Sequence, residues 1–289
     1  MSTDYLLEKK LKDEAPELHQ RVRDSVFVLQ EMLERFLPRF PDFTDHSILH
    51  SLDVLDYCNR LLGQEQIERL SPGECYVLIM ACYLHDIGMG VGQKDYEEFS
   101  KKIEFGDFFE TNASADAANT IRAFHNEYSG LFIRKYAELL EIPTEETLFA
   151  IIQVSRGHRK TDLFDVREYP DLQTEYGAIR MAYLAAVIRL ADEIDVGADR
   201  NPELLFDISG LTQQSAIEAF GSHESIRHVD VTEDSVILHV KPIAPKYIQL
   251  IEALNEKIQR TLDYCRRAAE RRSDLRIRQV RSVIEYCEQ

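Results

Sequence analysis

The residues best suited to chemistry in this sequence are histidines and aspartates spread along its first two thirds. The stretch ACYLHDIGMG, residues 81–90, places His85 beside Asp86 at the end of an apolar run, where Gly88 and Gly90 interrupt the helical pattern. Imidazole and carboxylate together suit Fe, Mn, Co, Ni or Zn. The other candidate ligands are His50, His125, His158 and Asp192, with His46 four residues before His50.

A single histidine in helical sequence is usually a core or surface residue, so no one of these positions establishes a site. Taken together, the order His, His-Asp, His, His, Asp favours one shared metal centre. The five cysteines form no C-x-x-C pair, so no thiolate cluster competes for a softer metal. We therefore expect imidazole and carboxylate ligands from separate helices, which fix a site better than loops do.

Hydrophobic periodicity predicts a mainly α-helical fold. Residues 91–112 are expected to form a long loop with short helices. The β-branched segments Ile226–Val231 and Val236–Val240 flank a turn-like TEDS sequence and predict a two-stranded hairpin. Helices are expected over residues 22–36, 45–62 (capped by Thr44 or Asp45), 72–85, 113–124, 126–140, 144–156, 174–194 and 245–272, with a last helix reaching residue 287.

This pattern predicts two parts. Residues 1–200 are expected to form a helical domain that carries the metal centre, with the N-terminal helices of residues 1–40 packed on it. Residues 201–289 are expected to form a small α+β appendage made of the hairpin and long helices.

Composition is that of an ordinary soluble protein, with 44% hydrophobic and 29% charged residues. No apolar run reaches the roughly 18 residues that a membrane span needs. The N-terminal residues are charged throughout, unlike a secretory signal. An odd number of cysteines without paired spacing indicates a reducing compartment, so we expect a cytoplasmic protein with no membrane partner.

Net charge is −17, but one segment opposes this balance. Residues 255–283 hold nine basic and four acidic residues. An acidic body repels long polyanions, so long nucleic acid is not an expected partner. The basic segment would pack on its own body, or on a second copy or a partner protein. No Walker-type phosphate loop is present, so ATP-driven work is not expected.

The ligand order resembles the HD-domain superfamily of metal-dependent phosphohydrolases. The similarity covers roughly residues 45–199, and its clearest pieces are DHSILH (45–50), LHDIG (84–88) and LADEID (190–195). The two additional histidines resemble the branch of the superfamily that holds two metals. The hairpin and long helix resemble the HD-CE variant of bacterial conflict systems. This resemblance implies an HD-type helical bundle.

The resemblance also implies roles for individual residues. One divalent metal would be held by His50, His85, Asp86 and Asp192, and a second by Asp86, His125 and His158. Asp86 would be the catalytic bridge that holds a nucleophilic water, as sites with two ions about 3.5–4 Å apart require. The cofactor would be one or two ions of Mn, Fe, Co, Ni or Zn, with Mg as a further candidate.

Four further residues are candidates for substrate phosphate or for supporting the ligands: His46, Arg159, Lys160 and Asp195. Several two-metal relatives have a lysine directly after the His-Asp-x-Gly turn, and Met89 stands there in this chain. Arg159 and Lys160, next to His158, are the candidates to supply that positive charge instead.

The expected function is a metal-dependent phosphohydrolase, either a phosphodiesterase or a nucleotide phosphohydrolase. Its substrate would be a cyclic nucleotide, a cyclic dinucleotide or a nucleoside triphosphate. Two alternatives stay open: an HD-type nuclease for single strands, and a metal-containing regulatory module that signals to a partner. The sequence leaves open which nucleotide, which metal and how many ions, and the oligomeric state.

Overall fold

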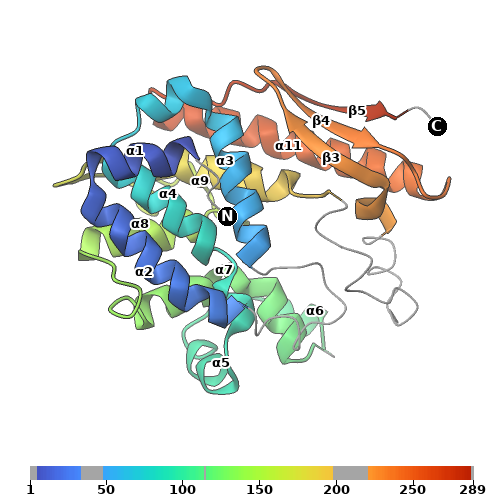
Figure 1. Ribbon diagram of the computed structural model, residues 1–289. Coiled ribbons are helices and arrows are strands. Elements are labelled where there is room, and N and C mark those ends of the chain that lie inside the picture. The colour runs from blue at the N-terminus through green and yellow to red at the C-terminus, as the bar shows by residue number, and fades with distance from the viewer. Residues whose placement is uncertain (1–4, 34–47, 114, 198–220, 288–289) are drawn as a thin grey trace.

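The computed structural model describes residues 5–33, 48–113, 115–197 and 221–287. Within these residues the protein is mainly α-helical, as predicted, with a small sheet near the C-terminus (Figure 1). The helices are α1 (Leu6–Glu14), α2 (Pro16–Leu33), α3 (Ile48–Glu68), α4 (Pro72–Leu84), η1 (Ile87–Gly90, a 3₁₀ turn), α5 (Gln93–Phe99), α6 (Phe108–Thr111), α7 (Ala117–Lys135), α8 (Glu145–Arg156), α9 (Met181–Ile194) and α11 (Tyr247–Arg272). The strands are β1 (Asp171–Thr174), β2 (Gly177–Arg180), β3 (Ile226–Val231), β4 (Ser235–Val240) and β5 (Arg281–Tyr286).

Helix α4 is the centre of the bundle. Every residue from Gly73 to Leu84 is buried, and α1, α2, α3, α8 and α9 pack around it. Its start follows the sequence signals: Pro72 is in the first turn, and Ser71 with Glu74 forms a capping box that satisfies two terminal N–H groups. Because this helix is buried on all sides, its last residues deliver His85 and Asp86 into the interior.

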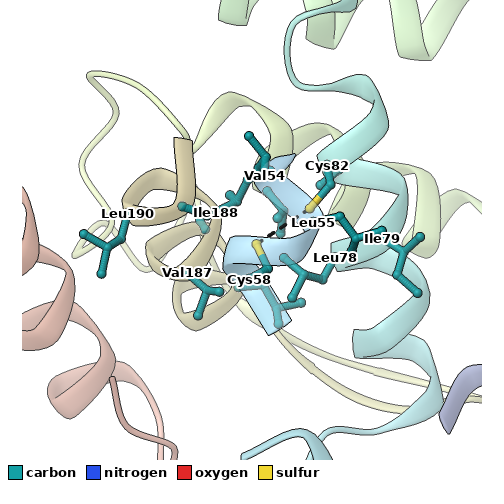
Figure 2. Close-up of a cluster of buried hydrophobic side chains, with 14 of the residues drawn as sticks. Val54, Leu55, Cys58, Leu78, Ile79, Cys82, Val187, Ile188 and Leu190 are labelled. Carbon is teal, nitrogen blue, oxygen red and sulfur yellow. Dashed lines mark hydrogen bonds between the residues drawn. The ribbon is translucent and has the colours of Figure 1, made fainter. Parts of the chain in front are cut away.

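A close-packed apolar layer joins α3, α4 and α9 (Figure 2). Val54, Leu55 and Cys58 of α3 meet side chains of α4 and α9, and all three are fully buried. The Cys58 and Cys82 sulfur atoms lie 3.7 Å apart as free thiols. Close packing of this kind resists small displacements, so the ends of the three helices keep fixed positions relative to one another.

The turn after α4 packs directly against α7. A side chain at Gly88 would collide with the backbone of His125 and with Ser129. The Gly88 N–H donates to the Ser129 hydroxyl at 2.9 Å, and that hydroxyl donates to the His85 carbonyl at 2.6 Å. Glycine is therefore required here because the backbone of η1 lies against the helix that carries His125.

Three helix predictions need correction. The two helices predicted over residues 113–124 and 126–140 have different outer bounds: they form α7 (Ala117–Lys135), whose two halves meet at the non-helical Phe124, where the break was predicted. Helix α3 continues to Glu68 past a non-helical Gly63. The predicted helix over residues 174–194 is instead the β1–β2 hairpin followed by α9. Gly177, with φ of +99°, supports the turn of that hairpin, a conformation that glycine adopts without strain.

The predicted last helix, reaching residue 287, is also wrong. Residues 281–286 form β5, which pairs in parallel with β4, so the expected two-stranded hairpin is part of a three-stranded sheet in the order β3-β4-β5. The sheet lies along α11, and α11 packs on α9 (Figure 1). Ser282 of β5 hydrogen-bonds Asn255 and Gln259 of α11, so tertiary pairing decides the conformation of this segment.

Some predictions fall outside the described residues. These are the cap at Thr44 or Asp45, the end of the helix predicted over residues 22–36, and the domain boundary at residue 200. Among the described helices, none is long and apolar enough by itself to cross a membrane. The segments Pro72–Gly90 and Gln93–Phe99 meet the length and composition test only as a pair bent by 99°.

A buried ion pair connects α4 to the hairpin. The Glu74 carboxylate is fully buried and accepts two side-chain hydrogen bonds from Arg180, each 2.7 Å long. Arg180→Met leaves this buried charge without a cationic partner, and we expect it to lower the free energy of unfolding by about 3–5 kcal/mol. Arg167→Met, at a side chain that is 89% exposed, should cost less than about 1 kcal/mol. Urea unfolding measures both values, and equal midpoints would refute this role for Arg180.

Candidate metal centre

Six predicted ligand residues come together from five helices or their ends. His50 lies in α3, His85 and Asp86 follow α4, His125 lies in α7, and His158 follows α8. Asp192 lies in the last turn of α9. The side chains of the first five are at most 6% exposed, whereas that of Asp192 is 23% exposed. The centre is therefore buried on one side and open at Asp192.

The first group of ligand atoms consists of His50, His85 and Asp192. His50 Nε2 lies 3.1 Å from His85 Nε2 and 3.4 Å from Asp192 Oδ1. His85 Nε2 lies 3.8 Å from the same Asp192 oxygen. Asp86 joins this group through Oδ2, which is 3.6 Å from the Nε2 atom of each histidine.

The second group faces the other oxygen of Asp86. His125 Nε2 lies 3.2 Å from Asp86 Oδ1, and His158 Nε2 lies 3.6 Å from it. The two Nε2 atoms are 2.9 Å apart. One carboxylate thus presents each of its oxygens to a different histidine pair, which is the placement that a bridging ligand needs.

Hydrogen bonds identify which ring nitrogen of each histidine carries the proton. The Nδ1 atoms of His85, His125 and His158 face the backbone carbonyls of Cys82, Arg122 and Ser155 at 2.9, 2.8 and 2.5 Å. A carbonyl only accepts, so these Nδ1 atoms donate and the neutral rings present lone pairs at Nε2.

His50 follows the same rule, because its Nδ1 lies 2.6 Å from Asp195 Oδ2. Four Nε2 lone pairs therefore point at one another in two close pairs, beside the carboxylates of Asp86 and Asp192. Neighbouring lone pairs repel unless a cation lies between them. The donor set and its orientation consequently fit divalent metal ions, and nitrogen with carboxylate oxygen suits a transition metal.

Burial keeps two of these histidines neutral. It lowers the pKa of His85, although the nearby Asp86 charge opposes this effect. It lowers the pKa of His158 much further, and the neighbouring His85 and His125 act in the same direction. For Asp192, burial raises the pKa, but the neighbouring His50, His85 and His158 side chains outweigh it, so the carboxyl pKa lies well below its usual range. These directions favour neutral His85 and His158 and an ionised Asp192, the forms that bind metal.

The other predicted residues take different places. Asp195 is buried and contacts Nδ1 of His50, on the side of the ring away from the other ligands. Arg159 and Lys160 line a cavity of about 540 Å³ that opens over Asp86, His125, His158 and Asp192. His46 lies outside the described residues.

Several residues that line this cavity were not identified by sequence analysis. Arg122 precedes His125 by one turn of α7, and Arg189 precedes Asp192 by one turn of α9. Lys257 and Thr261 come from α11, and their side chains contact Glu193 at 2.7 and 3.3 Å. The spacing of the two arginines from His125 and Asp192, one helical turn in each case, is a signal in the sequence that could identify them. Nothing local in the sequence marks the α11 residues, because only the packing of α11 on α9 brings them to the cavity.

Arg189 positions the loop that carries His158. Its guanidinium donates to the carbonyls of Gly157, Arg159 and Thr161 at 2.7, 3.1 and 2.9 Å. It also lies over the ring of Tyr264 of α11. The loop is strained at Lys160, where φ is +21°, so these contacts stabilise a conformation that the chain would not prefer alone.

The bundle and its buried His/Asp centre define an HD-type fold with a candidate divalent metal site. A family model described as HD-CE matches residues 40–274, most of the chain. The chain therefore belongs to the HD-CE family, an HD-domain variant, which together with the centre indicates a metal-dependent hydrolase. Searches of curated proteins and of solved structures found no match.

The lowered pKa values of His85 and His158 predict how the stability of the metal-free protein depends on pH. Both side chains ionise near pH 6.5 when unfolded, so below that pH the unfolded chain binds more protons than the native one. The stabilising contribution of the two neutral histidines is therefore complete above about pH 7. As the pH falls, the free energy of unfolding decreases by up to about 1.4 kcal/mol per pH unit for each histidine. Urea unfolding with a chelator at pH 8 to 5 measures this slope. His158→Gln should make it shallower, and an unchanged midpoint from pH 7 to 5 would contradict it.

Metal content distinguishes ligands from structural histidines. Asp86→Asn should lose most of the bound transition metal, and His125→Ala or His158→Ala should lose part of it. Stability of the metal-free protein should change little, because each histidine truncation also removes a lone-pair repulsion.

Asn59→Ala is the opposite control. Asn59 Oδ1 accepts from the Leu7 N–H at 3.0 Å, so its loss should cost about 1–3 kcal/mol without changing metal content. Elemental analysis with thermal unfolding tests this, and wild-type metal content in all three site variants would refute it.

Proposed function

We propose that this protein is a metal-dependent phosphohydrolase that cleaves a phosphoester or phosphoanhydride bond of a small nucleotide. The observation that carries the proposal is Asp86, whose two carboxylate oxygens face two separate histidine pairs at the base of a cavity. Sites of this type hydrolyse phosphoesters when two ions share a carboxylate. His50, His85, Asp86 and Asp192 would hold one divalent ion, and Asp86, His125 and His158 a second.

When bound, such ions supply Lewis acidity toward phosphoryl oxygens and lower the pKa of a coordinated water. The residues of this chain contribute orientation and charge. Asp195 keeps the Nδ1 proton on His50, and backbone carbonyls do the same for the other three histidines. Fixed tautomers keep all four Nε2 atoms available as ligands without reorganisation.

Basic side chains of the cavity support an anionic substrate. Arg122, Arg159, Lys160, Arg189 and Lys257 line it together with the acidic side chains of Asp86, Asp192 and Glu193. Burial lowers the pKa of Arg122, and the nearby Arg159 charge lowers it further. Two cations held close together in a partly buried position are stabilised by an anion bound between them, and a phosphate group has the required charge and acceptors.

The size of the cavity and the overall charge favour a small substrate. A volume of about 540 Å³ is within the range of small-molecule sites. A net charge of −17 opposes a long polyanion over the surface outside the basic segment of residues 255–283, whereas a nucleotide places its phosphates only among the cavity cations. The single-strand nuclease and the regulatory module remain the competing functions, and the first needs a basic track leading to the centre.

Turnover of small nucleotides is the direct test. We expect the protein with added Mn²⁺ to hydrolyse at least one member of a panel of cyclic nucleotides, cyclic dinucleotides and nucleoside triphosphates. Long single-stranded DNA should be cut weakly or not at all at physiological salt. Asp86→Asn should reduce turnover at least about 100-fold, because it removes a shared ligand. Asp56→Asn, on the outer side of the same bundle and paired with Arg60, is the matched control and should keep wild-type turnover.

The outcomes separate the three functions. Efficient degradation of long single strands by the unmodified protein would replace the nucleotide proposal with the nuclease. Metal binding without hydrolysis of any phosphoester in the panel or of DNA would favour the regulatory module.

A further inference from the structure

A second group of histidines and carboxylates lies on the three-stranded sheet. In the register of the strands, His228 of β3 is opposite His239 of β4, and His239 is opposite Glu285 of β5. Asp230 is two residues along β3 from His228, so its side chain points to the same face of the sheet. This face is opposite the one that packs on α11, since Val229, Val236 and Leu238, which alternate with these residues, are buried.

Three of these side chains bring one ligand atom each to the same place. Asp230 Oδ2 lies 3.1 Å from His239 Nε2 and 3.8 Å from His228 Nε2. The two imidazole rings are stacked, with centroids 4.1 Å apart and planes 14° apart. A tetrahedral ion with bonds of about 2.1 Å holds its ligand atoms about 3.4 Å apart, so the separations from Asp230 Oδ2 suit one ion. Nitrogen lone pairs lie in the ring planes, so the exposed His228 ring has to rotate out of the stack for both Nε2 atoms to face that ion.

The position of His239 between two carboxylates also favours a cation. Its Nε2 faces Asp230, and its Nδ1 lies 3.7 Å from Glu285 Oε2. A neutral imidazole has one N–H, so one of its nitrogens directs a lone pair at a carboxylate, a conflict that either a second ring proton or a bound cation removes. A cation bound by Nε2 and Asp230 would leave the Nδ1 proton on the side of Glu285, 3.7 Å away. Carboxylates orient metal-bound histidines in this way.

We propose that His228, Asp230 and His239 form a surface site for a late first-row divalent metal, Zn²⁺ or Cu²⁺, with Glu285 orienting His239. Two imidazoles and one carboxylate favour these ions over Mg²⁺ or Ca²⁺. The side chains of His228 and Asp230 are 57% and 51% exposed, so the remaining coordination positions face solvent. The site shares no residue with the centre at Asp86, and its ion would cross-link β3 and β4.

Metal stoichiometry of the full chain tests the proposal. Protein equilibrated by dialysis at micromolar free Zn²⁺ is analysed for zinc content, and the double variant His228→Gln, His239→Gln should bind one ion fewer per chain than wild type. Asp86→Asn should retain that ion, which separates the surface site from the buried centre. His19→Gln, at a histidine of α2 far from the sheet in sequence, is the matched control and should not change the stoichiometry.

Two single variants show whether the arrangement is a built site or only a pair of exposed histidines. Glu285→Gln should weaken zinc binding about tenfold, because it removes the partner of His239 Nδ1, and Asp230→Asn should weaken it further. Both residues are more than half exposed, so these variants keep the fold, as circular dichroism will show. Unchanged stoichiometry in the double variant would overturn the proposal. Wild-type zinc affinity in both single variants would overturn it as well, since binding would then be adventitious chelation by two imidazoles.

Discussion

Four imidazole lone pairs meet around one carboxylate in this protein, and this convergence is the constraint that the packing of the bundle has to satisfy. Each Nδ1 is committed to a fixed acceptor, three of them main-chain carbonyls and one the carboxylate of Asp195. The Nε2 atoms therefore cannot turn away, and they lie in pairs 3.1 and 2.9 Å apart. Without cations this arrangement is unfavourable, so the packing of the five surrounding helices must impose it.

The packing around α4 explains how that is achieved. The ligands come from the ends of α3, α4, α8 and α9 and from the middle of α7. The apolar faces of these helices form one core, so a shift of any helix would move a ligand and open a cavity at the same time. Gly88 allows η1 to lie against α7, and Arg189 holds the strained loop after His158. The polar centre would be unfavourable by itself, but burial of the apolar layer in Figure 2 stabilises the helices that carry its ligands.

Much of this was predictable because the signals are local. The capping box of α4, the helical periodicity and the order of the ligands along the chain all depend on residues close together in sequence. The strand β5 and the cavity residues Lys257 and Thr261 were not predicted, because each depends on contact between distant segments. Periodicity also failed for residues 174–180, where four-residue strands are too short to show alternation.

The net charge of the chain is negative, whereas the charged side chains that line the cavity are mostly basic. The chain carries −17 overall, yet basic side chains from α7, α9, α11 and the loop after α8 line the cavity beside the acidic ligands. Potential inside a partly enclosed space depends mostly on the nearest groups, because solvent and ions screen the distant ones. Helix α11 contributes to this local field through Lys257, which pairs with Glu193, the residue next to Asp192. Helix α11 therefore supplies part of the cavity wall in addition to supporting the sheet, and the site depends on segments as far apart in the sequence as α3 and α11.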